Sequence, residues 1–153
     1  MDAHVALVLL ALIGQAVSVD EYNVPEIVRK CVAAKEQSDI TLDARMNPFY
    51  LRGNLDGDQR ADYAAWVVQK GTGKAGILVC SGNGRISARI GAGASFSLQG
   101  GHRTDDLQIF NAWSIEEPDS SFRRDRIHVV AKERGSGLTY FDGRSFKWRQ
   151  LAE

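Results

Sequence analysis

The hydrophobic pattern along this chain changes once, from helical spacing to strand-like runs. After residue 22, apolar residues recur every three or four positions, as they do on one face of a helix: Val24, Ile27, Cys31 and Ala34. Asn23 and Pro25 stand at the beginning of this run, and Glu26 lies three positions after Asn23, which is typical of a capped helix start. We therefore expect a short helix whose buried face includes Cys31.

Beyond residue 38 the helical spacing does not return, and short apolar runs are separated by turns rich in Gly, Asn and Asp. Eight such runs predict strands, at residues 49–52, 62–69, 76–80, 85–90, 107–115, 126–132, 138–141 and 145–149. Most connections are short, and turns such as Asp142-Gly143 contain the glycine that supplies the positive φ of a hairpin. The expected fold is mainly β (α+β), with the N-terminal helix packed on an antiparallel meander of about seven or eight strands.

Two of the expected strands, at residues 62–69 and 76–80, are apolar on both faces. Strands of this kind are covered on both sides, so we expect them at the centre of the sheet. Cys80 shares a face with Leu78 on the second of these strands, because side chains alternate between faces. A bridge from Cys31 to Cys80 would therefore lay the helix across that face.

The composition is that of a globular protein. The chain has 153 residues, of which 44% are hydrophobic and 25% charged, and its formal net charge is +0. This length suits one hydrophobic core, and the proportions exclude a disordered or fibrous protein. A neutral net charge gives no electrostatic reason to expect a nucleic-acid partner.

A nearly continuous apolar segment precedes the helix, at residues 3–19. It is shorter than the roughly 20 residues of a membrane-spanning helix and ends in the small residues Ala16-Val17-Ser18, where a signal peptidase would cut. No Lys or Arg precedes it, which departs from the usual signal peptide. We expect residues 1–18 to be a signal peptide and residues 19–153 to form a single β-rich domain with an N-terminal helix. The expected location is periplasmic or secreted, with no membrane association after cleavage.

The two cysteines are expected to pair in such a location. An oxidising compartment allows Cys31 and Cys80 to form a disulfide. By the chain-entropy estimate, closing a loop of roughly 50 residues stabilises a fold by about 4 kcal/mol. Two buried free thiols are the alternative.

The segment with the most distinctive chemistry is the acidic loop at residues 54–62, between the first two expected strands. Oxygen-bearing side chains occupy alternate positions and the end of this loop: Asn54, Asp56, Asp58 and Asp62. Calcium takes about 6 to 8 oxygen ligands at about 2.3 to 2.6 Å, and a tightly turning loop directs alternate side chains to one centre. We therefore predict a calcium site formed by these four side chains, the carbonyl of Arg60 and water.

This loop resembles the calcium loops of FG-GAP and VCBS repeats, in which an Asp-x-Asp-Gly-Asp-Gly-x-x-Asp run leads into a strand. Asn54 replaces the first Asp of that pattern, and Gln59 replaces its second Gly. Because Asn54 lowers the charge and Gln59 strains the turn, the expected calcium binding is weak, with a dissociation constant of about 10⁻⁴ to 10⁻³ M. The alternative is a metal-free loop whose Asp side chains accept backbone N–H bonds and pair with Arg52 or Arg60.

FG-GAP and VCBS repeats normally assemble into propellers of about 4 to 8 blades, whereas this chain has a single copy of the motif. A propeller is therefore excluded by length. The rest of the chain looks like small exported bacterial proteins of uncharacterised family that carry one such loop, and this resemblance implies no established activity.

Other residues with catalytic or binding chemistry lack the partners that a site needs. His102 lies in a polar loop near carboxylates and could act as a base, but no nucleophile motif accompanies it. His128 alternates with apolar residues on an expected strand and should face solvent or a neighbouring side chain. Residues 123–126 include three arginines that could dock an acidic partner, although nearby carboxylates favour a solvated loop. The three tryptophans are expected in the core: Trp66, Trp113 and Trp148.

The sequence favours a non-enzymatic binding or interaction module with a weak calcium loop and an unidentified protein partner in the cell envelope. The first alternative is a periplasmic inhibitor or immunity-type protein that blocks a hydrolase with the loop at residues 91–106. The second alternative is a small hydrolase that uses His102. No residue is assigned as catalytic in the favoured interpretation.

Overall fold

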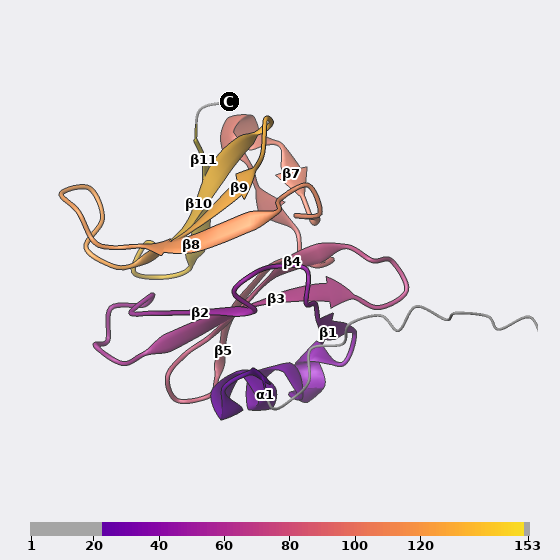
Figure 1. The fold of residues 1–153 in the computed structure, drawn as a ribbon. Coiled ribbons are helices and arrows are strands. Elements are labelled where there is room, and N and C mark those ends of the chain that lie inside the picture. The colour runs from indigo at the N-terminus through magenta and orange to yellow at the C-terminus, as the bar shows by residue number, and fades with distance from the viewer. Residues whose placement is uncertain (1–22, 152–153) are drawn as a thin grey trace, which may run out of the picture.

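Two antiparallel sheets pack face to face in the computed structural model, which describes residues 23–151 (Figure 1). The first sheet contains β1 (Ile40–Leu42), β2 (Tyr50–Gly53), β3 (Asp62–Gln69), β4 (Ala75–Cys80) and β5 (Ile86–Gly91). The second contains β8 (Ala112–Glu116), β9 (Arg126–Ala131), β10 (Gly135–Phe141) and β11 (Phe146–Gln150). Between them in the chain lies a small hairpin of β6 (Phe96–Ser97) and β7 (Arg103–Thr104), with the short helix η3 (Gln99–Gly101) at its tip. The predicted signal peptide, residues 1–18, lies outside the described residues.

The mainly β fold with an N-terminal helix is confirmed, and each expected strand has a counterpart. The strands do not form one continuous meander, however, because β2 to β5 and β8 to β11 belong to separate sheets. Gly91, Ala92 and Gly93 have φ values of 75°, 48° and 86°, so a left-handed turn carries the chain out of the first sheet after β5. β1 was not expected, and it pairs with the same edge of β3 as β2 does, at the other end of that strand.

The strand expected at residues 107–115 begins only at Ala112, because the first part of this segment is a turn that docks on β4. The carbonyl of Ala75 accepts hydrogen bonds from the backbone N–H groups of Ala92 and Leu107. Oδ1 of Asp106 accepts in turn from the N–H of Ala75, at 2.9 Å. The backbone of Leu107 is therefore bonded to the first sheet and cannot also enter the second.

The helix α1 (Glu26–Val32) covers the face of the first sheet that points away from the second sheet (Figure 1). Val28 and Cys31 are its buried residues. Cys31 is bonded to Cys80 on β4, with an S–S distance of 2.12 Å. The predicted disulfide is thus confirmed, as is the prediction that it places the helix over the Leu78 face of β4.

The limits of α1 differ from those of the expected helix. Pro25 is the N-cap residue, and no side chain caps the first turn. An N-cap side chain must lie immediately before the first helical residue to reach the N–H groups behind it, and Asn23 stands two positions too early. The predicted capping by Asn23 is therefore wrong. Ala34 lies beyond the end of α1, in the connection to the short helix η2 (Lys35–Gln37).

Both faces of the β3–β4 pair are buried, as expected for central strands. Towards the second sheet, Trp66 and Ile77 are fully buried in the main core. Towards α1, Val67 and Leu78 are fully buried in a smaller cluster that contains the disulfide. Each fully buried side chain of this size contributes about 1.5 to 3 kcal/mol, so this strand pair contributes substantially to the hydrophobic stability of both core clusters. The main core also contains Trp113 of β8, whose ring meets that of Trp66 edge to face at 5.6 Å.

Removing the disulfide tests how far α1 depends on it. We expect Cys31→Ala/Cys80→Ala to lower the free energy of unfolding by about 4 kcal/mol, because the unfolded chain regains the entropy of a large open loop. Urea denaturation followed by tryptophan fluorescence measures this change. Wild-type protein denatured in the presence of dithiothreitol is the control and should lose a similar amount. A loss of less than about 1 kcal/mol in the double variant would contradict the expectation.

A charged pair crosses the helix side of the first sheet. Arg89 of β5 places Nη1 2.7 Å from Oδ1 and Nη2 3.2 Å from Oδ2 of Asp39, which precedes β1. The Arg89 guanidinium, aided by the amide of Gln69, holds the pKa of Asp39 below its usual value. The pair therefore links the two outer strands of this sheet.

The stability that Asp39 supplies should depend on pH. Because its pKa is lowered on folding, this contribution is present above the unfolded pKa of about 3.9 and is lost as pH falls through the folded pKa. We expect Arg89→Gln to lower the free energy of unfolding at neutral pH by about 1 kcal/mol or less, since the Asp39 side chain is 42% exposed. Urea denaturation should show that the difference from wild type narrows as pH falls below about 4. A difference that is the same under acidic and neutral conditions would assign the loss to packing instead.

Candidate metal centre

The acidic loop, residues 54–62, joins β2 to β3 and is held against the second sheet. Leu55 is fully buried and belongs to the core between the sheets. The backbone N–H of Asn54 donates to Oδ2 of Asp125, 2.6 Å away, in the segment that leads into β9. The N–H of Asp125 donates in return to the carbonyl of Asn54, at 3.3 Å. The loop is therefore anchored at its start by one apolar side chain and two hydrogen bonds.

Asp62 closes the loop from inside. It is the first residue of β3 and only 1% exposed. Its Oδ2 accepts from the backbone N–H groups of Leu55, at 2.8 Å, and Asp56, at 3.1 Å, while its Oδ1 accepts from the N–H of Gly82, at 3.0 Å. Burial raises the pKa of Asp62 above its usual value and the nearby Asp56 charge adds to the rise, although the three N–H groups oppose it. Keeping the buried Asp62 carboxylate ionised therefore costs free energy, and a nearby cation would reduce this cost.

The other oxygen-bearing side chains turn inward through short bonds to the loop's own backbone. Oδ1 of Asn54 accepts from the N–H groups of Gly57, at 3.1 Å, and Gln59, at 3.3 Å. Asp56 Oδ1 accepts from the N–H of Asp58 at 3.0 Å. Turns of this kind are expected of Asn and Asp with or without a metal, so these bonds shape the loop and do not identify a ligand.

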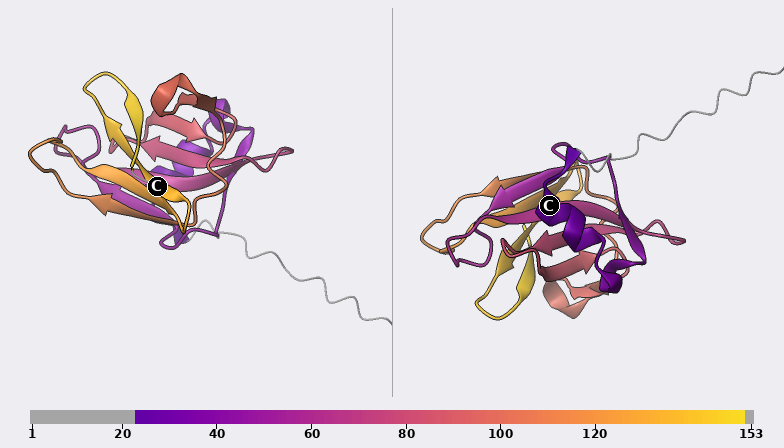
Figure 2. Two further views of the ribbon diagram at one scale, coloured as in Figure 1. Left: turned by 90° about the horizontal axis from the view of Figure 1, so that it is seen from above. Right: turned by 90° about the horizontal axis from the view of Figure 1, so that it is seen from below.

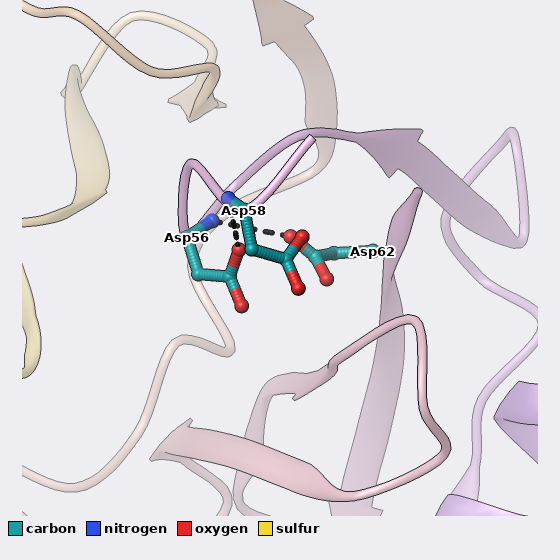
Figure 3. A group of neighbouring side chains, drawn as sticks. All are labelled: Asp56, Asp58 and Asp62. Atoms are coloured by element: carbon teal, nitrogen blue, oxygen red, sulfur yellow. Dashed lines mark hydrogen bonds between the residues drawn. The ribbon is translucent and has the colours of Figure 1, made fainter. Parts of the chain in front are cut away.

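Three of the predicted ligands come together. Carboxylate oxygens of Asp56, Asp58 and Asp62 all lie within 4.8 Å of one another, and Figure 3 shows the three carboxylates side by side. Hard oxygen donors at this spacing suit a cation such as calcium. Arg60 lies in the same loop, and its backbone N–H donates to Asp58 Oδ1 at 2.8 Å. Its carbonyl stays a predicted ligand.

The position where Gln59 replaces the usual glycine needs a left-handed backbone. Gln59 has a φ of 68°, and Gly57 has a φ of 86°. A residue with a side chain is strained in this region by about 1 to 2 kcal/mol, which confirms the predicted strain at Gln59. At Gly57 the restriction is also steric, because a Cβ there would collide with the side chain of Arg124.

Arg124 and Asp125 are the loop neighbours that the sequence did not reveal. They lie more than 60 residues from the loop in the chain, so no local spacing points to them. The expected alternative partners were Arg52 and Arg60. Within residues 23–151, neither of these arginines forms an ion pair with an Asp of the loop.

The remaining candidates lie apart from the loop. His102 is exposed at the tip of the β6–β7 hairpin. His128 is half buried on β9, with Nδ1 3.3 Å from Oε1 of Glu116. Trp66 and Trp113 are in the core as predicted, whereas Trp148 is only partly buried and lines a surface groove.

Comparison of this chain with family models, with curated proteins and with solved structures finds no match.

Asp62 should matter more for stability than the exposed carboxylates of the same loop. Asp62→Ala would leave three backbone N–H groups without their acceptor in a buried site, so we expect the free energy of unfolding to fall by about 2 to 4 kcal/mol. Asp58→Ala, the matched control, removes an exposed carboxylate and should cost less than about 1 kcal/mol. Chemical denaturation in the presence of a chelator measures both values. Equal losses would show that burial of Asp62 is not what stabilises the loop.

Proposed function

We propose that this chain is a non-enzymatic interaction module, periplasmic or secreted, whose acidic loop binds calcium weakly. The observation that carries the proposal is the approach of the Asp56, Asp58 and Asp62 carboxylates to within 4.8 Å. Among the described residues, none of the three is paired with a cationic side chain. Their mutual repulsion and the burial of Asp62 both favour a bound cation.

Calcium bound at this loop would stabilise the structure of a neighbouring surface and would not take part in catalysis. Gly57 of the loop touches Arg124, whose guanidinium lies 5.3 Å from the ring centre of Phe141 and donates to the Phe141 carbonyl at 3.4 Å. Arg124 and Phe141 line a groove of about 330 Å³ together with Tyr140 and Arg149. The loop thus supports one wall of a groove that a partner could occupy.

The location outside the cytoplasm is supported by the bond between Cys31 and Cys80, because disulfides persist in oxidising compartments. None of the helices within residues 23–151 has the length and apolar character that a membrane crossing requires.

The contacts of the two described histidines support a non-enzymatic role. His102 is exposed, and among the side chains that the structure describes its imidazole has no hydrogen-bond partner. Nδ1 of His128 contacts the carboxylate of Glu116, and Ser114, the residue opposite it on β8, makes no hydrogen bond to its imidazole among the bonds that the described residues form. Neither histidine therefore has the contact between nucleophile and base that covalent catalysis uses.

A calcium titration tests the loop. At a calcium concentration about 30 times the dissociation constant, binding to the folded state alone should stabilise the protein by about 2 kcal/mol and raise its melting temperature by several degrees. Asp58→Ala should abolish most of this shift. Glu36→Ala, which removes an exposed carboxylate from η2, is the matched control and should leave the shift intact. No shift in wild-type protein at about 30 mM calcium, which is about 30 times the weakest expected dissociation constant, would contradict the proposal.

Asn54→Asp tests whether the charge of the loop limits its affinity. The aspartate retains the oxygen that accepts from Gly57 and Gln59 and adds a negative charge, so we expect calcium to bind about 3 to 10 times more tightly. Isothermal titration calorimetry measures the change. An unchanged or weaker affinity would mean that Asn54 does not face the ion.

A further inference from the structure

Strand β11 lies at the rim of the second sheet (Figure 2). Among the described strands it pairs only with β10. The register of this pairing shows which backbone N–H and C=O groups of β11 are hydrogen-bonded to β10 and which are not. At the two ends of the ladder, the N–H of Asp142 donates to the carbonyl of Ser145, and the N–H of Leu151 donates to that of Ser136. Bonded pairs in an antiparallel ladder recur at every second residue, so from Ser145 to Leu151 the odd-numbered residues face β10.

The even-numbered residues, Phe146, Trp148 and Gln150, therefore direct their backbone N–H and C=O groups away from β10. No other backbone bond within residues 23–151 involves these groups. Three donors and three acceptors thus lie in a line along one edge, which is the arrangement that an extended chain joins as an additional strand.

A groove of about 770 Å³ follows this edge. Residues from both faces of β11 line it, with Trp148 on one face and Lys147 and Arg149 on the other. β6 forms a wall on the Trp148 face, where the ring of Phe96 lies 5.4 Å from that of Trp148. Because residues from both faces of β11 line the groove, a strand added at this edge would have side chains to contact on both of its faces.

The chemistry of this surface is aromatic on one side and cationic on the other. The groove shares Tyr140, Asp142 and Arg149 with the neighbouring groove of about 330 Å³, so the two adjoin. Together they are lined by four cationic side chains and one carboxylate: Lys147, Arg149, Arg123, Arg124 and Asp142. Because the chain as a whole has a formal net charge of +0, this is a local concentration of positive charge, and it complements an acidic partner.

A second copy of this chain does not suit the same edge. In an antiparallel pair of two β11 strands centred on Trp148, Lys147 of one copy would lie directly opposite Arg149 of the other. Like charges in this position destabilise a strand pair, and charged edge strands are a common protection against self-association. The charges that complement an acidic strand therefore also oppose dimerisation through β11.

We infer that the free edge of β11 binds an extended, acidic segment of a partner protein as a further strand of the second sheet. This inference rests on the proposed function as an interaction module and names the chemistry of its partner. Since side chains alternate along a strand, apolar residues of the segment face Phe96 and Trp148, and acidic residues face Lys147 and Arg149.

The test uses the folded, disulfide-bonded protein and a fluorescent octapeptide of alternating valine and glutamate. We expect saturable binding that weakens as salt is added, with no binding of the matching valine–lysine peptide. Amide exchange followed by nuclear magnetic resonance locates the strand. On binding, the N–H groups of Phe146, Trp148 and Gln150 should exchange more slowly, whereas those of Lys147 and Arg149, already bonded to β10, should change little.

Charge reversal supplies the matched variants. Lys147→Glu and Lys147→Glu/Arg149→Glu should each weaken binding of the valine–glutamate peptide, by about tenfold or more for the double variant. Lys147 is the safer single change for folding, because its side chain is exposed and lies 3.7 Å from that of Asp142 in a weak pair. Lys35→Glu/Arg85→Glu makes the same charge change at two exposed positions on the helix side of the first sheet and should bind like wild type.

Three results would overturn the inference: no binding of the valine–glutamate peptide, binding without slower exchange at Trp148, or reversible dimerisation of the wild-type protein whose strength Lys147→Glu changes. Each leaves the calcium titration unaffected. A chain that responds to calcium but fails the peptide test would thus retain the proposed function and lose only this partner site.

Discussion

Water must be excluded from both faces of the β3–β4 pair, because these two strands carry apolar side chains on both sides. One side is covered by α1, which the bond from Cys31 to Cys80 holds in place. The other side is covered by the second sheet, where Trp113 packs edge to face on Trp66. The helix has only seven residues, too few to be stable alone, so the sheet and the disulfide stabilise it. The three layers thus depend on one strongly apolar strand pair.

The acidic loop lies where β3 enters this arrangement, and its geometry follows from that position. Asp62 begins β3, so its carboxylate is buried by the same packing that buries the strand. This carboxylate accepts from two N–H groups of the loop and from the N–H of Gly82, and so ties the loop to the turn after β4. Asp125 and Arg124 then connect the loop to the second sheet. A cation among the carboxylates would therefore act on the joint between the two sheets and not only on one turn.

The second sheet covers the core with one face and leaves its β11 edge free. Trp148 illustrates how the two roles meet, because its ring packs against Phe96 and Phe110 at the margin of the core while its backbone belongs to the open edge. On the outer face, Arg149 lies over the rings of Phe122 and Tyr140, 4.8 Å and 5.5 Å from their centres. These contacts hold a charged side chain in a defined position beside the edge. Arg124, which supports the acidic loop, lines the adjoining groove.

The sequence by itself indicated eight of the strands and the central place of β3 and β4, because side-chain alternation and glycine positions are local properties, but it did not indicate the short strands β1, β6 and β7. It also located the disulfide and the three acidic residues that gather in the loop, since these lie close together in the chain or follow from which face of a strand is apolar. The tertiary structure alone decided that the strands divide into two sheets, that Asp125 and Arg124 meet the acidic loop, and that β11 is left without a partner on one side. The start of the helix was also not fixed by the sequence. The capping pattern pointed to Asn23, but such a pattern does not reveal at which residue a helix begins. The physical reason is that pairing between distant segments depends on which surfaces remain to be buried after the local elements form, and no local pattern records that.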